Sequence, residues 1–553
     1  MTGGRPADRR RPGLGLAGGG GGGAGGAGRA RGAEAGGGPA GPGPAALSGG
    51  LDGPQALRPL LDTVLDALAA GAARRAGPVP AGRPGPLAEQ VTAEFARPAA
   101  GPDALRRLTE LLAYGSADPA DPACAAHLHC PPLAVAVAAD LAVSALNPSQ
   151  DSWDQAPAAT ALETALLAEL AALVGFDPRR ATGVLTSGGT ESNLMGLMLA
   201  RDQILDGIVE VDGLPAGGRP LVFASQAAHF SVQRAAALLG LGERAVVAVP
   251  VDRELRMDPD GLARAMAEAV WEGGTPLAVV ATAGTTDTGA VDPLHRAADL
   301  AARYGAWLHV DAAYGGGALL SDRLAPLLDG IARADSVSLD WHKLGWQPAA
   351  AGVFLARRAE TYVSLLRRAV YLNPADDEEA GYPSLLGLSL RTTRRADAFK
   401  LAVTLRALGR AGLGALVDAC HDLALATAEA VRAEPALDLH CAPVLSTVVF
   451  RYLPAEAART GAARTGAGAG GTDAGRTGPD RLGAEADRVN AEVRRLLLRE
   501  GRAVVGRTEL PGSGPGRVRL KLTLLNPHTT AGQTAALLHE VVRAGREVER
   551  TRA

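Results

Sequence analysis

The stretch LAVVATAGTTDTGAVDPLHRAADLAARYGAWLHVDAAYGG, residues 277–316, holds two short apolar runs joined by a segment with helical spacing of its apolar residues. The same alternation extends from about residue 160 to residue 440, with further apolar runs of strand length at residues 221–225, 245–251, 336–340 and 352–357. Strands that alternate with helices predict an α/β fold, in which a mostly parallel sheet carries helices on both faces. Ligands bind to such sheets beyond the carboxyl ends of the strands.

Composition divides the chain into segments. A segment rich in glycine, alanine, proline and arginine cannot bury enough apolar surface to fold, which predicts disorder. The expected segments are a disordered extension at 1–50, an N-terminal helical segment at 51–159, a large domain at 160–440, and a smaller α+β domain at 441–553 that contains a low-complexity insertion at 455–483. Within the smaller domain, residues 446–453 and 517–525 have the apolar pattern of strands.

Charge and hydropathy exclude several classes of partner. The 59 acidic and 56 basic residues nearly balance, so we expect neither a nucleic acid nor a membrane as a partner. The longest apolar run, residues 133–146, is shorter than the roughly 18 residues of a membrane span. The N-terminus lacks the apolar core of a signal peptide, and we expect a cytoplasmic protein. The four cysteines form no CxxC pair, and we expect no metal site.

Lysine is rare in this chain. Among 56 basic residues, lysine occurs only at positions 343, 400 and 521, and the others are arginine. Arginine cannot replace a lysine that must lose its proton and attack a carbonyl group, because guanidinium stays charged. Lys343 follows a strand in SVSLDWHKLGWQP, where a Schiff-base lysine would be placed. Lys400 lies in a helical pattern and Lys521 in an alternating strand, so we interpret both as structural.

The segment TSGGTESN, residues 186–193, connects a predicted strand to a predicted helix. Gly188 and Gly189 would let the backbone approach an anion, which the free N–H groups of the helix then bind. Thr190 adds a hydroxyl group and is also a candidate N-cap. An ordinary glycine-rich turn before a helix would show the same pattern, and both interpretations stay open.

Three more polar residues follow predicted strands. Asp311 ends the run WLHVDAA, where a buried carboxylate needs a partner such as a cationic ring nitrogen. A salt bridge or a helix cap would serve equally well. His229 is placed to stack on a flat aromatic ligand, although a lone histidine is more often a satisfied core residue. His342, next to Lys343, could donate to a phosphate group. All of these residues are predicted to meet at one edge of the sheet.

The chain resembles the pyridoxal-dependent group II amino-acid decarboxylases. The resemblance rests on TSGGTESN, AHFSVQRAAALLGLG, VVATAGTTDTGAVDPL, WLHVDAAYGG, DSVSLDWHK and LNPADDEE followed by SLRTTRRADAFKLAVTLRALG. The last segment and DSWDQAPAATALE are most similar to bacterial L-2,4-diaminobutyrate and siderophore-type lysine decarboxylases. The resemblance implies the fold type I of aspartate aminotransferase, with a seven-stranded sheet, and pyridoxal 5'-phosphate (PLP) as cofactor. It also implies a homodimer with active sites at the interface, in which residues 51–159 pack on the partner.

The resemblance assigns roles to individual residues. Lys343 would hold the cofactor, Asp311 would pair with its ring nitrogen, and His229 would stack on its ring. The other expected cofactor-binding residues are Gly188, Gly189 and Thr190 at the phosphate with His342 nearby, and Thr282 and Ala313 along the cofactor.

The family also has a mobile loop over the site, which in several members carries a tyrosine that protonates the substrate carbon. The matching segment here, residues 372–390, contains Tyr382 and four consecutive acids, and we expect no stable secondary structure in it. Tyr382 is therefore a candidate catalytic residue. The alternative is an exposed aromatic residue that only packs when the loop closes.

The function that follows is decarboxylation of an L-amino acid, with a diamino acid such as L-2,4-diaminobutyrate or lysine as the expected substrate. An aromatic amino acid or glutamate is the alternative substrate. A transaminase or a carbon–carbon lyase would use the same fold. A non-catalytic scaffold protein is the alternative from another class, against which Lys343, Asp311 and His229 argue.

Overall fold

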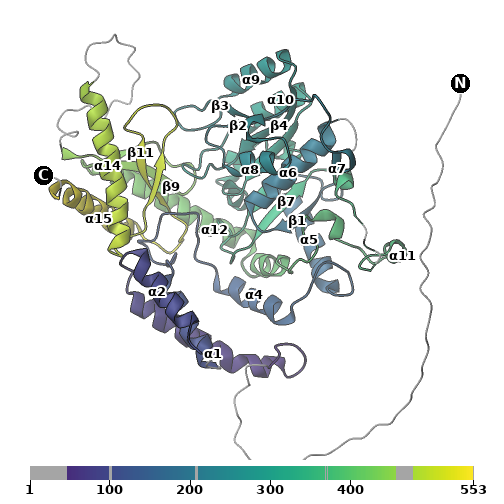
Figure 1. The fold of residues 1–553 in the computed structure, drawn as a ribbon, viewed down its shortest axis with the longest axis horizontal. Helices are drawn as coiled ribbons and strands as arrows, with labels where there is room; N and C mark the ends of the chain where they lie inside the picture. The colour runs from purple at the N-terminus through teal and green to yellow at the C-terminus, as the bar shows by residue number, and fades with distance from the viewer. Residues whose placement is uncertain are drawn as a thin grey trace, which may run out of the picture.

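A seven-stranded sheet forms the centre of the large domain in the computed structural model (Figure 1). The strands, in spatial order, are β1 (Thr182–Thr186), β7 (Gly352–Ala356), β6 (Ser336–Asp340), β5 (Trp307–Ala312), β4 (Thr275–Thr282), β2 (Pro220–Ser225) and β3 (Val246–Val249). Strand β7 is antiparallel to both of its neighbours, and the other pairs are parallel. All six apolar runs form strands of this sheet, so the predicted mostly parallel α/β fold is confirmed.

The structure describes residues 46–98, 102–205, 209–367, 369, 371–455 and 477–551. Most of the extension predicted at 1–50 and most of the insertion predicted at 455–483 lie outside the described residues.

Both faces of the sheet are buried. In β4, Val279 and Ala281 pack into one apolar cluster, whereas Ala278 and Val280 pack into another. A strand that is covered on both faces needs apolar residues at every position, which explains the continuous apolar runs of the sequence. The covering helices are α5 (Pro157–Val174), α6 (Gly189–Ile204), α8 (Ser231–Leu238), α9 (Pro259–Trp271), α10 (Leu294–Arg303) and α12 (Ala398–Ala433), with the short α7 (Val209–Asp212) after α6.

Helix α5 corrects one expectation. Among the described residues it is the one helix that is long and apolar enough to cross a membrane, although the sequence suggested that no run was. It carries Glu163, which pairs with Arg394 at 2.7 Å, and each of these side chains is only 1% exposed. The helix also packs on β1 and α12. Its apolar composition therefore reflects its place in the core of the large domain.

A smaller antiparallel sheet lies beside the large domain (Figure 1). Its order is β10 (Gly506–Glu509), β11 (Val518–Thr523), β9 (Thr447–Tyr452) and β8 (Leu437–Leu439). Helices α14 (Thr477–Arg499) and α15 (Ala531–Arg550) and the end of α12 pack against it. Strands β9 and β11 match the predicted runs, whereas β8 and β10 were not predicted because they have only three and four residues.

The N-terminal helices are α1 (Gly53–Arg75), α2 (Pro84–Phe95), α3 (Pro102–Gly115) and α4 (Ala134–Leu146). Helix α1 packs along α3, and in Figure 1 α1 and α2 lie below the smaller sheet and its helices. Short 3-10 turns lie at Glu243–Ala245, Gly315–Leu320, Ala325–Leu328, Ile331–Arg333, Ala359–Ser364 and Leu386–Leu388.

Candidate active site

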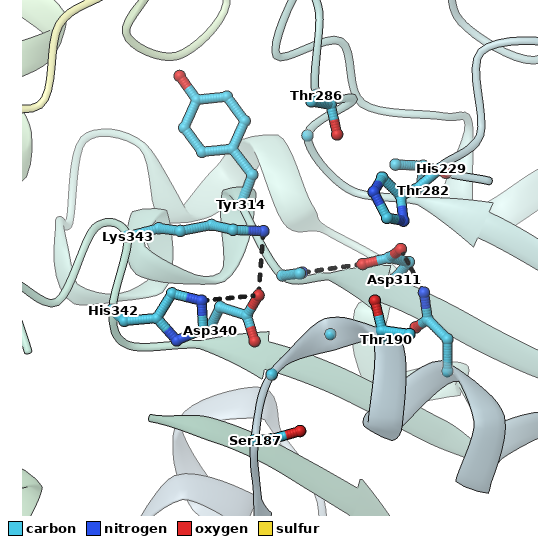
Figure 2. Close-up of a pocket in the computed structure, with 15 residues that line it drawn as sticks. Ser187, Thr190, His229, Thr282, Thr286, Asp311, Tyr314, Asp340, His342 and Lys343 are labelled. Carbon is cyan, nitrogen blue, oxygen red and sulfur yellow. Dashed lines mark hydrogen bonds and ion pairs between the residues drawn. The ribbon is translucent and has the colours of Figure 1, made fainter. Parts of the chain in front are cut away.

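A cavity of about 360 Å³ lies at the carboxyl ends of the parallel strands (Figure 2). All nine expected cofactor-binding residues line it: Gly188, Gly189, Thr190, His229, Thr282, Asp311, Ala313, His342 and Lys343. The sequence did not single out six further lining residues, which are Ser187, Asn193, Gly284, Thr286, Tyr314 and Asp340. The structure therefore brings together residues that are up to 156 positions apart, between Ser187 and Lys343.

The glycine turn after β1, at Gly188 and Gly189, leaves the first backbone N–H groups of α6 free. Gly188 is the N-cap of α6 and has a φ of 151°, a region that favours glycine. Thr190 is not the N-cap, contrary to one of its predicted roles, because the helix already begins at Gly189. Glu191 accepts a hydrogen bond from Ser187 N at 2.7 Å and pairs with Arg391 at 3.0 Å, which fixes the turn. An anion can bind the free N–H groups at such a helix start.

Asp311 is held in the cavity by three hydrogen bonds. Its Oδ2 accepts from Asn193 Nδ2 at 2.8 Å, and its Oδ1 accepts from Ala313 N at 3.1 Å and from Ser338 Oγ at 3.2 Å. His309, buried behind it, hydrogen bonds to Asn193 Oδ1 through Nε2 at 2.9 Å. These contacts hold a buried carboxylate ready for a cationic partner.

His229 lies next to Asp311 in Figure 2. Its Nδ1 hydrogen bonds to Ser231 Oγ at 2.8 Å, and Asn193 Nδ2 donates to the same hydroxyl at 2.9 Å. Burial lowers the pKa of His229, and the charge of Asp311 opposes that shift only in part. The ring is therefore neutral near pH 7 and is held in one orientation, as a stacking partner requires.

Lys343 reaches into the cavity from the turn that follows β6 (Figure 2). Its Nζ lies 3.0 Å from Oδ2 of Asp340, the last residue of β6. His342 lies beside this pair, with its Nε2 3.5 Å from the same oxygen. Burial also lowers the pKa of His342.

The other two lysines do not line the cavity. Lys400 is fully buried between Asp140 and Asp397, each 3.1 Å from its Nζ. Lys521 of β11 pairs with Asp287 at 2.8 Å, next to Thr286 at the cavity. Both lysines form ion pairs with residues of other segments of the fold, which is consistent with a structural role.

Tyr382 is not among the residues that line the cavity, and its side chain is 51% exposed. It follows α11 (Ala375–Glu379), a short helix that projects from the large domain in Figure 1. The sequence predicted no secondary structure there. The prediction was wrong because the acids lie in the first turn of a helix, where negative charge is favourable.

The apolar residues directly after Lys343 lie outside the cavity lining. Leu344 and Trp346 are buried in the core of the large domain, and Trp346 Nε1 donates to Leu525 O at 2.8 Å. Neither residue lines the cavity, and both pack in the core of the large domain.

Comparison with known proteins identifies the family. The model of the pyridoxal-dependent decarboxylase conserved domain matches residues 85–453. The chain belongs to the pyridoxal-dependent decarboxylase family. It is 42% identical over 428 residues to an L-2,4-diaminobutyrate decarboxylase of Rhizobium meliloti (strain 1021), covering 77% of this chain and 79% of that protein. It is 38% identical to an L-2,4-diaminobutyrate decarboxylase of Acinetobacter baumannii, covering 79% and 82% of the two chains.

Solved structures of the family have the same fold. The glutamate decarboxylase domain of a diaminobutyrate-pyruvate transaminase and L-2,4-diaminobutyrate decarboxylase from Vibrio parahaemolyticus matches with a TM-score of 0.76 and 32% identity, covering 91% of this chain and 98% of that one. Oryza sativa TDC with PLP and tryptamine matches with a TM-score of 0.76 and 26% identity, covering 89% and 98%. The fold is fold type I, and this decarboxylase uses PLP as its cofactor.

The cavity fits this cofactor in three respects. It contains a glycine turn for a phosphate, a supported carboxylate for a ring nitrogen, and one lysine amine. Thr282 Oγ1 is buried and has no hydrogen-bond partner among the described residues, so it has a donor to offer. One residue does not fit as simply, because Asp340 places a carboxylate close to the turn that would hold the phosphate.

Proposed function

We propose that this decarboxylase converts L-2,4-diaminobutyrate into 1,3-diaminopropane and carbon dioxide. The observation that carries the proposal is the likeness to two L-2,4-diaminobutyrate decarboxylases across more than three quarters of the chain. The small cavity, lined mainly by hydroxyl groups, carboxylates and glycines, agrees with a small polar substrate.

We further propose roles for the cavity residues. Lys343 binds the cofactor covalently, Asp311 pairs with the ring nitrogen, and His229 stacks on the ring. The phosphate is held by Gly188, Gly189 and Thr190 with His342 nearby, and Thr282 and Ala313 line the cofactor. The convergence of all nine residues on one cavity supports these assignments.

Each residue then contributes a simple physical task. PLP, when bound, supplies an aldehyde that links to amines and a ring that accepts the electron pair left when carbon dioxide departs. Asp311 keeps a proton on the ring nitrogen, and Asn193 and Ser338 keep Asp311 in place. Lys343 would hold the cofactor aldehyde through its amine until the substrate amine takes that place. Tyr382 is the proposed donor of the proton that the substrate carbon takes up, which requires the loop of α11 to close over a cavity.

We propose that the active enzyme is a homodimer with its active sites at the interface. Helices α1, α2 and α3 each leave two large apolar residues exposed, and the most exposed of each pair, Leu65, Phe95 and Leu112, are 64%, 84% and 68% exposed. Apolar surface of this kind favours a protein partner. Sedimentation equilibrium should give twice the chain mass. A monomer with full activity would contradict the proposal.

A screen of carbon dioxide release tests the substrate. L-2,4-diaminobutyrate, lysine, ornithine, glutamate, tyrosine and DOPA should be offered separately to the PLP-loaded enzyme, with the amine product measured in parallel. We expect the highest kcat/KM for L-2,4-diaminobutyrate, with 1,3-diaminopropane as product. A higher value for glutamate or an aromatic amino acid would replace the proposed substrate, and no release from any of them would favour a non-catalytic role.

A further inference from the structure

Asp340 is one of the cavity residues that the expected roles do not explain. Its side chain is only 3% exposed, and its Oδ2 is 3.0 Å from Lys343 Nζ. Its other oxygen, Oδ1, is buried and accepts no hydrogen bond from any described residue. A buried carboxylate is costly unless it is paired, so the ammonium group of Lys343 is its counter-ion.

The same carboxylate lies against the glycine turn. A Cβ atom added to Gly189 would be 3.2 Å from Asp340 Oδ2, and one added to Gly188 would be 3.8 Å from Oδ1. The carboxylate therefore lies close to the N–H groups that begin α6, where an anionic phosphate would bind. A phosphate bound there would place negative charge close to this carboxylate, and the two charges would repel each other.

His342 does not relieve this repulsion. Its Nε2 is 3.5 Å from Asp340 Oδ2, which is too long for a good hydrogen bond. Burial lowers the pKa of His342, so the ring is neutral near pH 7. Its orientation is set from the other side, because its Nδ1 accepts from Ala351 N at 3.3 Å.

We propose that Asp340 is an internal counter-ion that positions Lys343 before the cofactor arrives and opposes binding of the cofactor phosphate. Its charge holds the Lys343 amine at the cavity end of β6. The same charge makes the glycine turn a weaker phosphate site than its backbone alone would be. Asp340 thereby keeps the cofactor exchangeable.

Asp340→Asn tests the proposal because it removes the charge and keeps the shape. Cofactor-free protein should be titrated by calorimetry, at constant ionic strength, with inorganic phosphate, with PLP, and with pyridoxal, which lacks the phosphate. We expect the variant to bind phosphate and PLP at least tenfold more tightly than the wild type, about 1.4 kcal/mol, and to bind pyridoxal no more tightly. Asp322→Asn removes the same charge from a 96% exposed side chain and should change none of the three constants.

Two results would overturn the proposal. Weaker phosphate binding by Asp340→Asn would mean that the carboxylate orients His342 or the turn in favour of the phosphate. An equal increase in the affinities for pyridoxal and for PLP would mean that the charge of Asp340 acts on Lys343 alone. If thermal unfolding shows that Asp340→Asn does not fold, Asp340→Ser in the same three titrations gives the same two tests.

Discussion

The replacement Asp311→Asn tests the electrostatic centre of the site. The wild-type carboxylate accepts hydrogen bonds from Asn193 Nδ2, Ala313 N and Ser338 Oγ. It carries no N–H or O–H group that would need an acceptor. In the variant, one of its oxygens becomes an amide NH2 group. Whichever way the new amide turns, that group faces at least one existing donor, so one buried hydrogen bond is lost.

The size of the effect follows from these contacts. Leaving one buried donor unsatisfied costs about 1–3 kcal/mol of folding stability. The loss of a charge-assisted bond to a cationic ring nitrogen costs about 1.5–3 kcal/mol of cofactor affinity, or roughly 10- to 150-fold in Kd. In its proposed role the carboxylate also stabilises the charge that develops during decarboxylation, so we expect kcat to fall by more than about 100-fold.

Three measurements check the prediction: urea unfolding of the cofactor-free protein, fluorescence titration with PLP, and carbon dioxide release at saturating PLP. Ser338→Ala is the matched control, since it removes one donor and keeps the carboxylate, and it should lower kcat much less. A rate of Asp311→Asn within a factor of three of the wild type would mean that the ring nitrogen has another partner.

Three further predictions concern stability and proton transfer. Glu163→Gln should lower the free energy of unfolding by about 3–5 kcal/mol in urea, because it leaves Arg394 buried without its counter-charge; a loss below about 1 kcal/mol would contradict this. Burial lowers the pKa of His309, so the unfolded chain takes up a proton first as pH falls below about 6.5. The free energy of unfolding should therefore decrease as the pH falls below about 6.5, and it should decrease less in His309→Asn. Tyr382→Phe should release carbon dioxide but less than an equal amount of amine, whereas equal amounts would eliminate Tyr382 as the proton donor.

The sequence predicted those site residues whose place depends only on their position next to a predicted strand or helix. Each of Thr282, Asp311 and Lys343 lies at or just beyond the end of an apolar run, and parallel strands bring such ends to one edge of a sheet. The glycine turn was likewise visible as a strand followed by glycines and a helix.

Contacts between distant segments could not be predicted in this way. Asn193 and Asp311 are 118 residues apart, and Glu163 and Arg394 are 231 residues apart, so no local pattern connects them. Asp340 was overlooked because it ends an apolar strand directly before Lys343, and only the three-dimensional structure shows how close it lies to Gly189. Strand β8 has three residues, too few for an alternating pattern.

Borohydride reduction of the PLP-loaded enzyme tests the central claim most directly. Reduction should fix the cofactor irreversibly to the amine that holds it, and peptide mapping then locates the modified residue. We predict a single modified peptide that carries the cofactor on Lys343, and no modification in Lys343→Ala. Modification of Lys400 or Lys521 instead of Lys343 would contradict the assignment of the site.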